Sequence, residues 1–331
     1  MTQPTLNRRQ LLAATAATGA ALTAACQTSA ATNGGPDLTG KSILITGCSS
    51  GFGYLGALYY QTLGARVFAT MRNLPRSEAD ELDGETMAEG PPFDILELDV
   101  LSDESVNQTV AEAERLNGGA LDVIINNAGI GTGAPVELQD MAMMQRLFDT
   151  NVMGCQRVAR AALPKMRAQK SGLVVNVSSQ LGRVMVPGMG MYSSTKFAVE
   201  SMSEQMAYEL VPHGVDMTIV QPGGYPTKIW ENGNRYTAAM LEDADDERKA
   251  AYQALVAGAL RNGGGSTDPM DVPRAIAGVI AMAPGKRPLR LPVHPGPKPQ
   301  QAINQVSAQT QVALLGNSPF GPWVKDVNER A

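Results

Sequence analysis

The most constraining feature of the sequence is a buried strand that runs into a glycine-rich loop and then into a helix. Ser42–Thr46 is a short apolar, β-branched run, and residues 47–53 after it read Gly-Cys-Ser-Ser-Gly-Phe-Gly, followed by a helical pattern to about Leu63. In this context glycines let the backbone approach a pyrophosphate, and the helix N-terminus offers free N–H groups. The pattern therefore predicts an α/β fold that binds a dinucleotide.

A second predicted strand, residues 66–70, bears on the choice of dinucleotide. An acidic residue at the end of this strand would bind a ribose 2′-hydroxyl and repel a 2′-phosphate. Thr70 occupies that place here, and Arg72 lies two residues on. Because an arginine can pair a phosphate through two hydrogen bonds, the sequence favours NADP over NAD. The alternative is that Arg72 is a solvated surface residue.

Further strands are predicted at residues 94–100, 121–125 and 215–220, each followed by small or polar residues. Ligands of an open parallel sheet bind beyond the carboxyl ends of its strands. Asp99 could accept a hydrogen bond from the adenine amino group, while residues 126–129, Asn-Asn-Ala-Gly, approach a cofactor or brace the sheet. Thr227 is a candidate contact of a nicotinamide carboxamide; the alternative is that it caps a turn.

Tyr192 and Lys196 form the candidate reactive pair. In a helix over residues 190–211 they lie at i and i+4, on one face. An ammonium beside a phenol favours the phenolate, which suits a group that gives and takes a proton. The hydroxyl of Ser179, thirteen residues upstream of Tyr192, could hydrogen-bond the same substrate oxygen. Ser178 is the adjacent candidate.

Asn151 lies within a predicted helix that continues to about Ala168, with Pro164 as a kink. Asparagine is unfavourable in mid-helix by propensity. Two explanations are open: its side chain meets a buried water, or it is exposed.

Six motifs that occur in one order along residues 41 to about 230 resemble the short-chain dehydrogenase/reductase family. They are residues 46–53, residues 126–129, Asn151, Ser179, Tyr192-x-x-x-Lys196 and residues 222–227. The turn at residues 70–72 and the segment 288–293 are similar to the branch that includes 17β-hydroxysteroid and retinol dehydrogenases. The resemblance implies a single α/β Rossmann-fold domain, a doubly wound seven-stranded parallel sheet in the order 3-2-1-4-5-6-7.

The resemblance also implies residue roles. Tyr192 would be the acid/base, Lys196 would hold the nicotinamide ribose, Ser179 would position the substrate oxygen, and Asn151 would keep a water in the proton relay. The expected cofactor contacts are Gly47, Ser49, Ser50, Gly51, Phe52, Gly53, Arg72, Asp99, Val100, Asn127, Ala128, Gly129, Tyr192, Lys196, Pro222, Gly223 and Thr227.

These residues predict an NADP-dependent oxidoreductase that interconverts an alcohol and a ketone or aldehyde. One alternative is a non-catalytic dinucleotide-binding sensor on the same fold; another is an epimerase or dehydratase of the same family. A sensor would have no physical need for the complete set of Asn151, Ser179, Tyr192 and Lys196. The set therefore favours the oxidoreductase.

The second half of the sequence is expected to bind the substrate. Residues 228–265 have a helical pattern and predict a mobile lid. Met185, Tyr225 and Trp230 are candidates for the wall of an apolar pocket, which predicts an apolar small-molecule alcohol or carbonyl as substrate. Residues 294–331, rich in proline and glutamine, predict a surface tail. The family resemblance implies a homo-oligomer, a dimer or tetramer.

Composition excludes two classes of site. The net charge is -5 and no basic stripe occurs, which argues against a nucleic-acid partner. Two histidines and three cysteines at unrelated spacings give no pattern of metal ligands. We therefore expect a metal-free site.

The first 35 residues read as a leader rather than as part of the fold. Arg8 and Arg9 precede a mildly apolar, alanine-rich run, which is typical of a twin-arginine export signal. Cys26 after small residues resembles a lipoprotein cleavage site, so a lipid anchor at Cys26 and cleavage just beyond it are both open. The pattern predicts an exported protein, periplasmic or membrane-anchored in a bacterium, with its folded domain at residues 36–293. The alternative is a disordered cytoplasmic extension.

Overall fold

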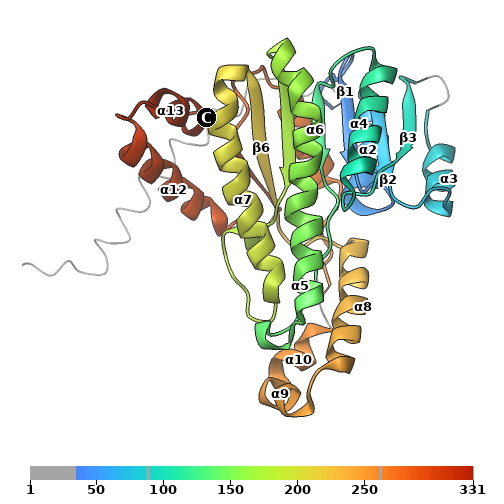
Figure 1. Ribbon diagram of the computed structural model, residues 1–331, viewed down its shortest axis with the longest axis vertical. Coiled ribbons are helices and arrows are strands. Elements are labelled where there is room, and N and C mark those ends of the chain that lie inside the picture. Colours follow the sequence, from blue (N-terminus) through green and yellow to red (C-terminus); the bar gives the residue numbers. More distant parts are fainter. Residues whose placement is uncertain (1–34, 88–89, 261–262, 331) are drawn as a thin grey trace, which may run out of the picture. The chain divides into compact units, whose positions relative to one another are not determined.

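The folded unit that begins at Pro36 is built on one sheet of seven parallel strands (Figure 1). The computed structural model describes residues 35–87, 90–260 and 263–330. The strands are β1 (Ser42–Thr46), β2 (Arg66–Met71), β3 (Phe93–Glu97), β4 (Val123–Asn126), β5 (Gly172–Val177), β6 (Val215–Pro222) and β7 (Arg290–Val293). They lie in the order β3-β2-β1-β4-β5-β6-β7. The predicted doubly wound sheet and its strand order are confirmed.

The apolar runs of the sequence explain which strands are central. Every residue of β1, β4, β5 and β6 is buried, whereas the edge strand β3 is only partly buried. A parallel strand covered on both faces requires such continuous apolar runs, since neither face meets water. The register pairs Ile43 with Val67 of β2 and with Val123 of β4, which places β1 between these two strands.

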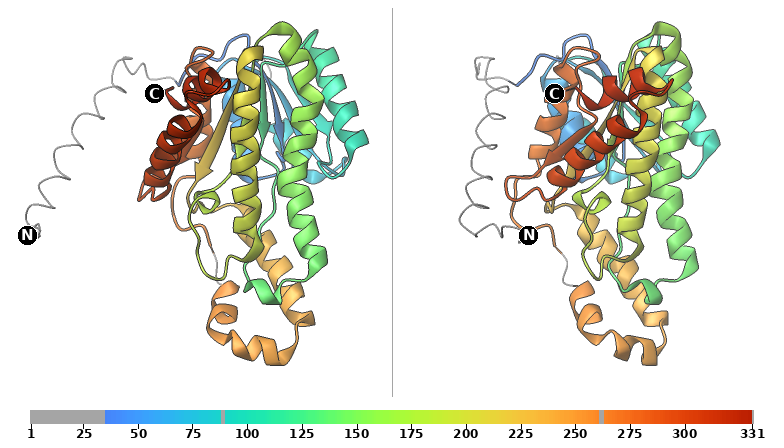
Figure 2. Two further views of the ribbon diagram at one scale, coloured as in Figure 1. Left: turned by 60° about the vertical axis from the view of Figure 1, so that its left-hand side comes forward. Right: turned by 90° about the vertical axis from the view of Figure 1, so that its left-hand side faces the viewer.

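Helices cover both faces of the sheet (Figure 2). They are α2 (Gly51–Thr62), α3 (Ser77–Gly84), α4 (Asp103–Asn117), α5 (Met141–Phe148), α6 (Gly154–Gln169), α7 (Gly190–Leu210), α8 (Lys228–Asp243), α9 (Asp246–Ala251), α10 (Gln253–Ala259), α11 (Asp271–Ala281), α12 (Gln300–Leu315) and α13 (Gly321–Asn328). One core cluster joins α4, α6 and α7 to one face, and a second joins α2, α3 and α11 to the other.

Two segments extend this sandwich. The region predicted as a lid contains α8, α9 and α10, which project beyond one end of the strands (Figures 1 and 2). The region 294–331, expected to be a surface tail, instead holds α12 and α13. Val324 and Val327 of α13 are buried in the core cluster of α7, and Arg330 pairs with buried Asp216 at 2.6 Å. Composition alone did not reveal these long-range contacts.

The predicted export signal and Cys26 lie outside the described residues, so they stay predictions. Within the described part of the chain, no helix combines the length and the apolar content needed to cross a membrane. The same described residues contain no group of three or more His, Cys, Asp or Glu side chains that could hold a metal ion.

Candidate active site

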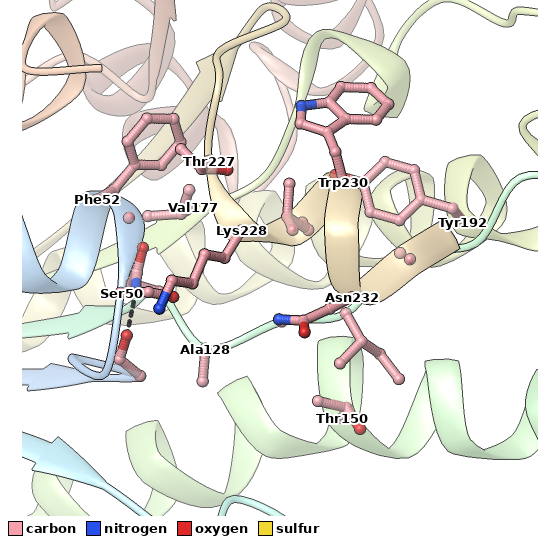
Figure 3. Close-up of a pocket in the computed structure, with 18 of the residues that line it drawn as sticks. Ser50, Phe52, Ala128, Thr150, Val177, Tyr192, Thr227, Lys228, Trp230 and Asn232 are labelled. Atoms are coloured by element: carbon pink, nitrogen blue, oxygen red, sulfur yellow. Dashed lines mark hydrogen bonds between the residues drawn. The ribbon is translucent and has the colours of Figure 1, made fainter. Parts of the chain in front are cut away.

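A cavity of about 570 Å³ lies beyond the carboxyl ends of the strands, where it meets α8 (Figure 3). Most of the predicted site residues line it: Gly47, Ser49, Ser50, Gly51, Phe52, Arg72, Asp99, Val100, Asn127, Ala128, Gly129, Ser179, Tyr192, Lys196, Pro222, Gly223 and Thr227. Gly53 and Asn151 are not among the lining residues. The structure thus brings motifs from across the whole sheet into one cavity.

At two positions of the loop after β1 only glycine fits, because neighbouring atoms lie too close to the place that a Cβ would occupy. A Cβ on Gly47 would lie 2.9 Å from the Ala128 Cα, and one on Gly53 would lie 2.5 Å from the Gly47 carbonyl oxygen. Gly53 therefore closes the loop on itself rather than lining the cavity. Helix α2 begins at Gly51, and the Ser50 side chain makes no capping hydrogen bond. The first N–H groups of α2 remain available to an anion.

The asparagine motif after β4 braces this loop. The backbone N–H groups of Asn127 and Ala128 each donate to the Thr46 hydroxyl at 3.0 Å. The Asn127 side-chain amide donates to the Thr46 carbonyl at 2.9 Å. Of the two roles considered for the motif, bracing is visible directly, and Ala128 and Gly129 also line the cavity.

The end of β2 differs by one residue from the sequence prediction. The strand continues to Met71, and Thr70 is fully buried with its hydroxyl donating to the Ile45 carbonyl at 2.9 Å. The Thr70 side chain is therefore buried against β1, whereas Met71 and Arg72 line the cavity. The part of this strand end that lines the cavity thus consists of Met71 and Arg72 and not of an acidic residue.

A second arginine at this end of the cavity was missed by the sequence analysis. Arg76 and Glu78 both line the cavity and form a bidentate ion pair, at 2.6 and 2.9 Å. The hydrogen bonds from Arg76 lower the pKa of the Glu78 carboxyl to about 2. Arg76 is thus already neutralised, and no short sequence motif signals its position, because it depends on the turn after β2.

Helix α7 presents the reactive pair as its spacing predicted. Lys196 is buried, and its ammonium donates to the Val177 carbonyl at 2.9 Å, with Nζ 5.7 Å from the centroid of the Tyr192 ring. The Val177 carbonyl ends β5, so the sheet itself fixes the position of the ammonium. The Ser179 hydroxyl accepts a hydrogen bond from the Leu181 N–H at 3.1 Å and lines the same cavity.

The two adjacent serines have different surroundings. A Cβ on Gly182 would lie 2.8 Å from the Ser178 hydroxyl and 2.9 Å from Glu200 Cγ, so Ser178 packs between the loop and α7. The Ser178 hydroxyl has no hydrogen-bond partner among the residues that the structure describes. Both serines line the cavity, but the close packing of the Ser178 hydroxyl against Gly182 favours Ser179 as the residue that meets a substrate oxygen.

Asn151 is buried, which excludes the exposed alternative. It lies in a π-helical segment, η2 (Asp149–Met153), that joins α5 to α6. Its amide accepts from the Ile130 N–H and donates to the Ile130 carbonyl, both at 2.9 Å, and it donates to the Thr195 hydroxyl at 3.1 Å. Such π-helical turns are frequent at functional sites. Asn151 thus ties the loop after β4 to the helix that carries the reactive pair.

Helix α8 forms the wall opposite the glycine loop. Thr227, Lys228 and Trp230 line the cavity, and the Trp230 indole N–H donates to the Tyr225 carbonyl at 2.8 Å. Tyr225 also lines the cavity, but Met185 does not: its side chain is 75% exposed. The expectation that Met185 belongs to the pocket wall is therefore wrong, because Met185 is exposed and does not line the cavity.

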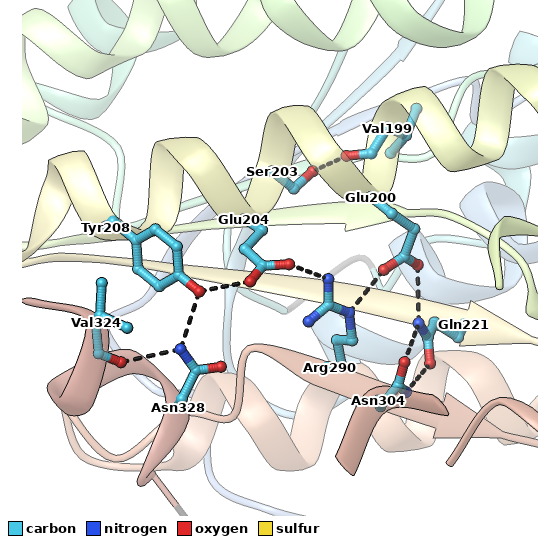
Figure 4. Close-up of polar contacts among 10 residues, drawn as sticks. All are labelled: Val199, Glu200, Ser203, Glu204, Tyr208, Gln221, Arg290, Asn304, Val324 and Asn328. Carbon is cyan, nitrogen blue, oxygen red and sulfur yellow. Dashed lines mark hydrogen bonds and ion pairs between the residues drawn. The ribbon is translucent and has the colours of Figure 1, made fainter. Parts of the chain in front are cut away.

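The far half of α7 is held by a buried ionic network (Figure 4). Arg290 of β7 donates to Glu200 at 2.8 Å and to Glu204 at 2.6 Å. Burial raises the pKa of Glu204, but the charge and hydrogen bond of Arg290 outweigh this effect, so its pKa is lowered overall. Gln221, just before the Pro222 loop, donates to Glu200 at 2.9 Å and accepts from Asn304 of α12 at 2.7 Å.

Comparisons with known proteins agree with this geometry. The family described as short chain dehydrogenase matches residues 41–237. Retinol dehydrogenase 8 of Bos taurus is 34% identical over 262 residues, which cover 76% of this chain and 80% of the relative. The 3-ketodihydrosphingosine reductase of Bacteroides thetaiotaomicron is 36% identical over 192 residues, covering 58% and 66%. A short-chain dehydrogenase structure from Streptomyces avermitilis aligns with a TM-score of 0.66 and 28% identity, covering 83% of this chain and 96% of that chain.

The chain belongs to the short-chain dehydrogenase/reductase family. It is an NAD(P)-dependent oxidoreductase that acts on CH–OH groups, and its predicted relationship to the retinol and hydroxysteroid dehydrogenases is confirmed.

We predict that Gly53→Ala distorts the glycine loop. The added methyl group would lie 2.5 Å from the Gly47 carbonyl oxygen and 2.6 Å from the Asn127 amide nitrogen. Overpacking of this kind costs about 1–3 kcal/mol of stability, and we expect the affinity for NADPH to fall about tenfold, which corresponds to 1.4 kcal/mol. Gly84→Ala is the control, because no atom of the described residues lies within 4 Å of its Cβ position. Unchanged NADPH binding in Gly53→Ala, measured by calorimetry, would contradict the assignment.

We predict that Arg290→Met lowers the free energy of unfolding by about 3–5 kcal/mol, because it leaves two buried carboxylates unpaired. Arg274→Met, which breaks an exposed pair with Asp268, should cost at most about 1 kcal/mol. Urea denaturation measures both.

The pH dependence gives a second check on this network. A carboxyl whose folded-state pKa is lowered stabilises the fold above its unfolded pKa, about 4.3 for glutamate, and loses that contribution as the pH falls. The difference between wild type and Arg290→Met should therefore shrink below about pH 4. Equal stability of the Arg290 and Arg274 variants at pH 7 would show that the network is not stabilising.

Proposed function

We propose that this protein is an NADP-dependent oxidoreductase that interconverts an alcohol and a ketone or aldehyde, with Tyr192, Lys196, Ser179 and Asn151 as its proton-transfer group. The observation that carries the proposal is that Tyr192, Lys196 and Ser179 line the same cavity as the glycine loop. Proton transfer to a substrate oxygen requires a titratable side chain, here Tyr192, and a hydrogen-bonding side chain, here Ser179, next to the bound cofactor.

The residues of the cavity fit a nicotinamide dinucleotide. The glycine loop cannot accept a Cβ at Gly47 without a contact of 2.9 Å, and the N–H groups at the start of α2 are free to bind a diphosphate. Arg72 would meet the adenosine end, and Pro222, Gly223 and Thr227 would hold the nicotinamide end. The dinucleotide supplies hydride transfer when bound.

Each polar side chain then has a distinct task at the substrate oxygen. Tyr192 exchanges a proton with that oxygen, and the nearby Lys196 ammonium favours the phenolate form. Ser179 donates a hydrogen bond that orients the same oxygen. Asn151 positions the helix and loop around them through its bonds to Ile130 and Thr195.

We further propose an apolar substrate. The cavity contains the apolar side chains of Ile130 and Leu181, from the loops after β4 and β5, and of Ile229 and Trp230 from α8, beside the polar α8 residues Glu231, Asn232 and Arg235. The similarity to retinol dehydrogenase 8 supports an alcohol or carbonyl with a bulky apolar body. Closure of α8 to α10 over such a substrate is part of this proposal.

We predict that Tyr192→Phe abolishes turnover and leaves cofactor binding intact. Loss of a positioned acid/base lowers kcat about 100-fold or more, while the phenyl ring preserves the packing of α7. The assay is NADPH oxidation with a panel of aliphatic, aromatic and steroid ketones, beside NADPH binding by fluorescence. Tight binding without turnover on any ketone by the wild type would favour a dinucleotide sensor.

The two serines provide a matched control for this experiment. Ser179→Ala should lower kcat, whereas Ser178→Ala should leave it within about threefold of the wild type, a difference of less than 1 kcal/mol. The reverse result would place the substrate oxygen beside Ser178.

We predict that Arg72→Gln selectively weakens NADPH. Removing a guanidinium that pairs the 2′-phosphate should raise the Kd for NADPH about tenfold and leave that for NADH unchanged. Arg115→Gln is the charge-matched control, since Arg115 lies on α4 in an exposed pair with Glu112. Equal binding of NADPH and NADH by the wild type would refute the preference.

A further inference from the structure

Lys228, the first residue of α8, extends its side chain into the cavity from the wall opposite the glycine loop. In Figure 3 its ammonium points toward Ser50. The residue before it, Thr227, touches the loop itself: a Cβ on Gly51 would lie 3.3 Å from the Thr227 Cβ. The starts of α8 and α2 therefore face each other across a narrow part of the cavity.

The side chains of the glycine loop do not balance the negative charge of a bound diphosphate. The loop of residues 47–53 contains no charged side chain, yet the diphosphate of a dinucleotide carries two negative charges. Of the other cations that line the cavity, Arg76 is paired with Glu78, Lys196 is bound to the Val177 carbonyl, Arg235 donates to Asn232, and Arg72 is assigned above to the adenosine end. Lys228 forms no ion pair with any residue that the structure describes. It is therefore a cation available to a bound anion.

The backbone at the start of α8 adds to this effect. Thr227 makes no side-chain capping hydrogen bond, and the same is true of Ser50 at the start of α2. Both helices thus present uncapped N–H groups, each at the positive end of its helix. A cation and two helix ends on opposite walls suit a dianion between them.

We infer that Lys228 is a cofactor-binding residue that holds the diphosphate from the α8 side of the cavity. The inference rests on the proposed function, because it assumes that the dinucleotide lies along the glycine loop. It also connects the two halves of the site: Ile229 and Trp230 follow Lys228 on the same helix and line the cavity. A bound diphosphate therefore anchors the start of the helix that contacts the substrate.

The test compares ligands with and without a diphosphate. Lys228→Met should raise the Kd of NADPH and of ADP-ribose about tenfold, as expected for loss of one charge-assisted hydrogen bond. Binding of adenosine 2′-monophosphate, which lacks the diphosphate, should stay within twofold. Lys228→Arg should restore ADP-ribose binding. The charge-matched control is Lys286→Met, because Lys286 is exposed and outside the cavity. Calorimetry measures affinity, and circular dichroism verifies folding.

The outcomes separate this inference from the proposed function. ADP-ribose bound equally by the wild type and Lys228→Met overturns the role of Lys228 alone. An equal loss for ADP-ribose and adenosine 2′-monophosphate, or a similar loss in Lys286→Met, shows only a long-range effect of charge and also overturns it. A folded wild type that binds neither NADPH nor ADP-ribose overturns the proposed function, and this inference with it.

Discussion

The site depends on one hydroxyl group, that of Thr46 at the end of β1. It accepts the backbone N–H groups of both Asn127 and Ala128, and so joins the ends of two adjacent strands that are about eighty residues apart in sequence. This contact brings the chain after β4 against Gly47, where a Cβ would not fit. Without this contact, the chain after β4 would not support the glycine loop, and the N–H groups at the start of α2 would not be directed toward the cavity.

The second constraint acts on α7, which carries the proposed catalytic residues at one end and a buried ionic network further along. Tyr192, Lys196, Glu200 and Glu204 follow one another at intervals of four, so they lie along one side of the helix. The Val177 carbonyl fixes Lys196, and Arg290 fixes the two glutamates. A buried ion pair is weak support for stability in itself, because desolvation opposes it. Its geometric effect here is to hold the rotation and height of α7 against β6 and β7.

Sequence patterns predicted the sheet and most of the cavity because both depend on local features. Apolar runs set the strands, and parallel strands place whatever follows them at one edge. The errors concern features that no short motif signals. Arg76 faces the cavity through the turn after β2, and Met185 is exposed and lies outside the cavity. The helices α12 and α13 were missed because their partners, such as Asp216 for Arg330, lie about a hundred residues away. The polar contacts of Asn151 arise likewise from segments far along the chain.

The cavity is therefore formed by two kinds of surface. Around the cofactor it consists largely of backbone and small side chains held by the sheet, and their close contacts leave little room for larger residues. On the α8 side it consists of long side chains from a helix beyond the sheet, whose positions no strand fixes. Substitutions on α8 can alter the shape that a substrate meets without disturbing the contacts that hold Lys196 and Ser179. In the proposed function, the chemistry and the substrate preference are thus carried by separate elements, and Lys228 lies where the two meet.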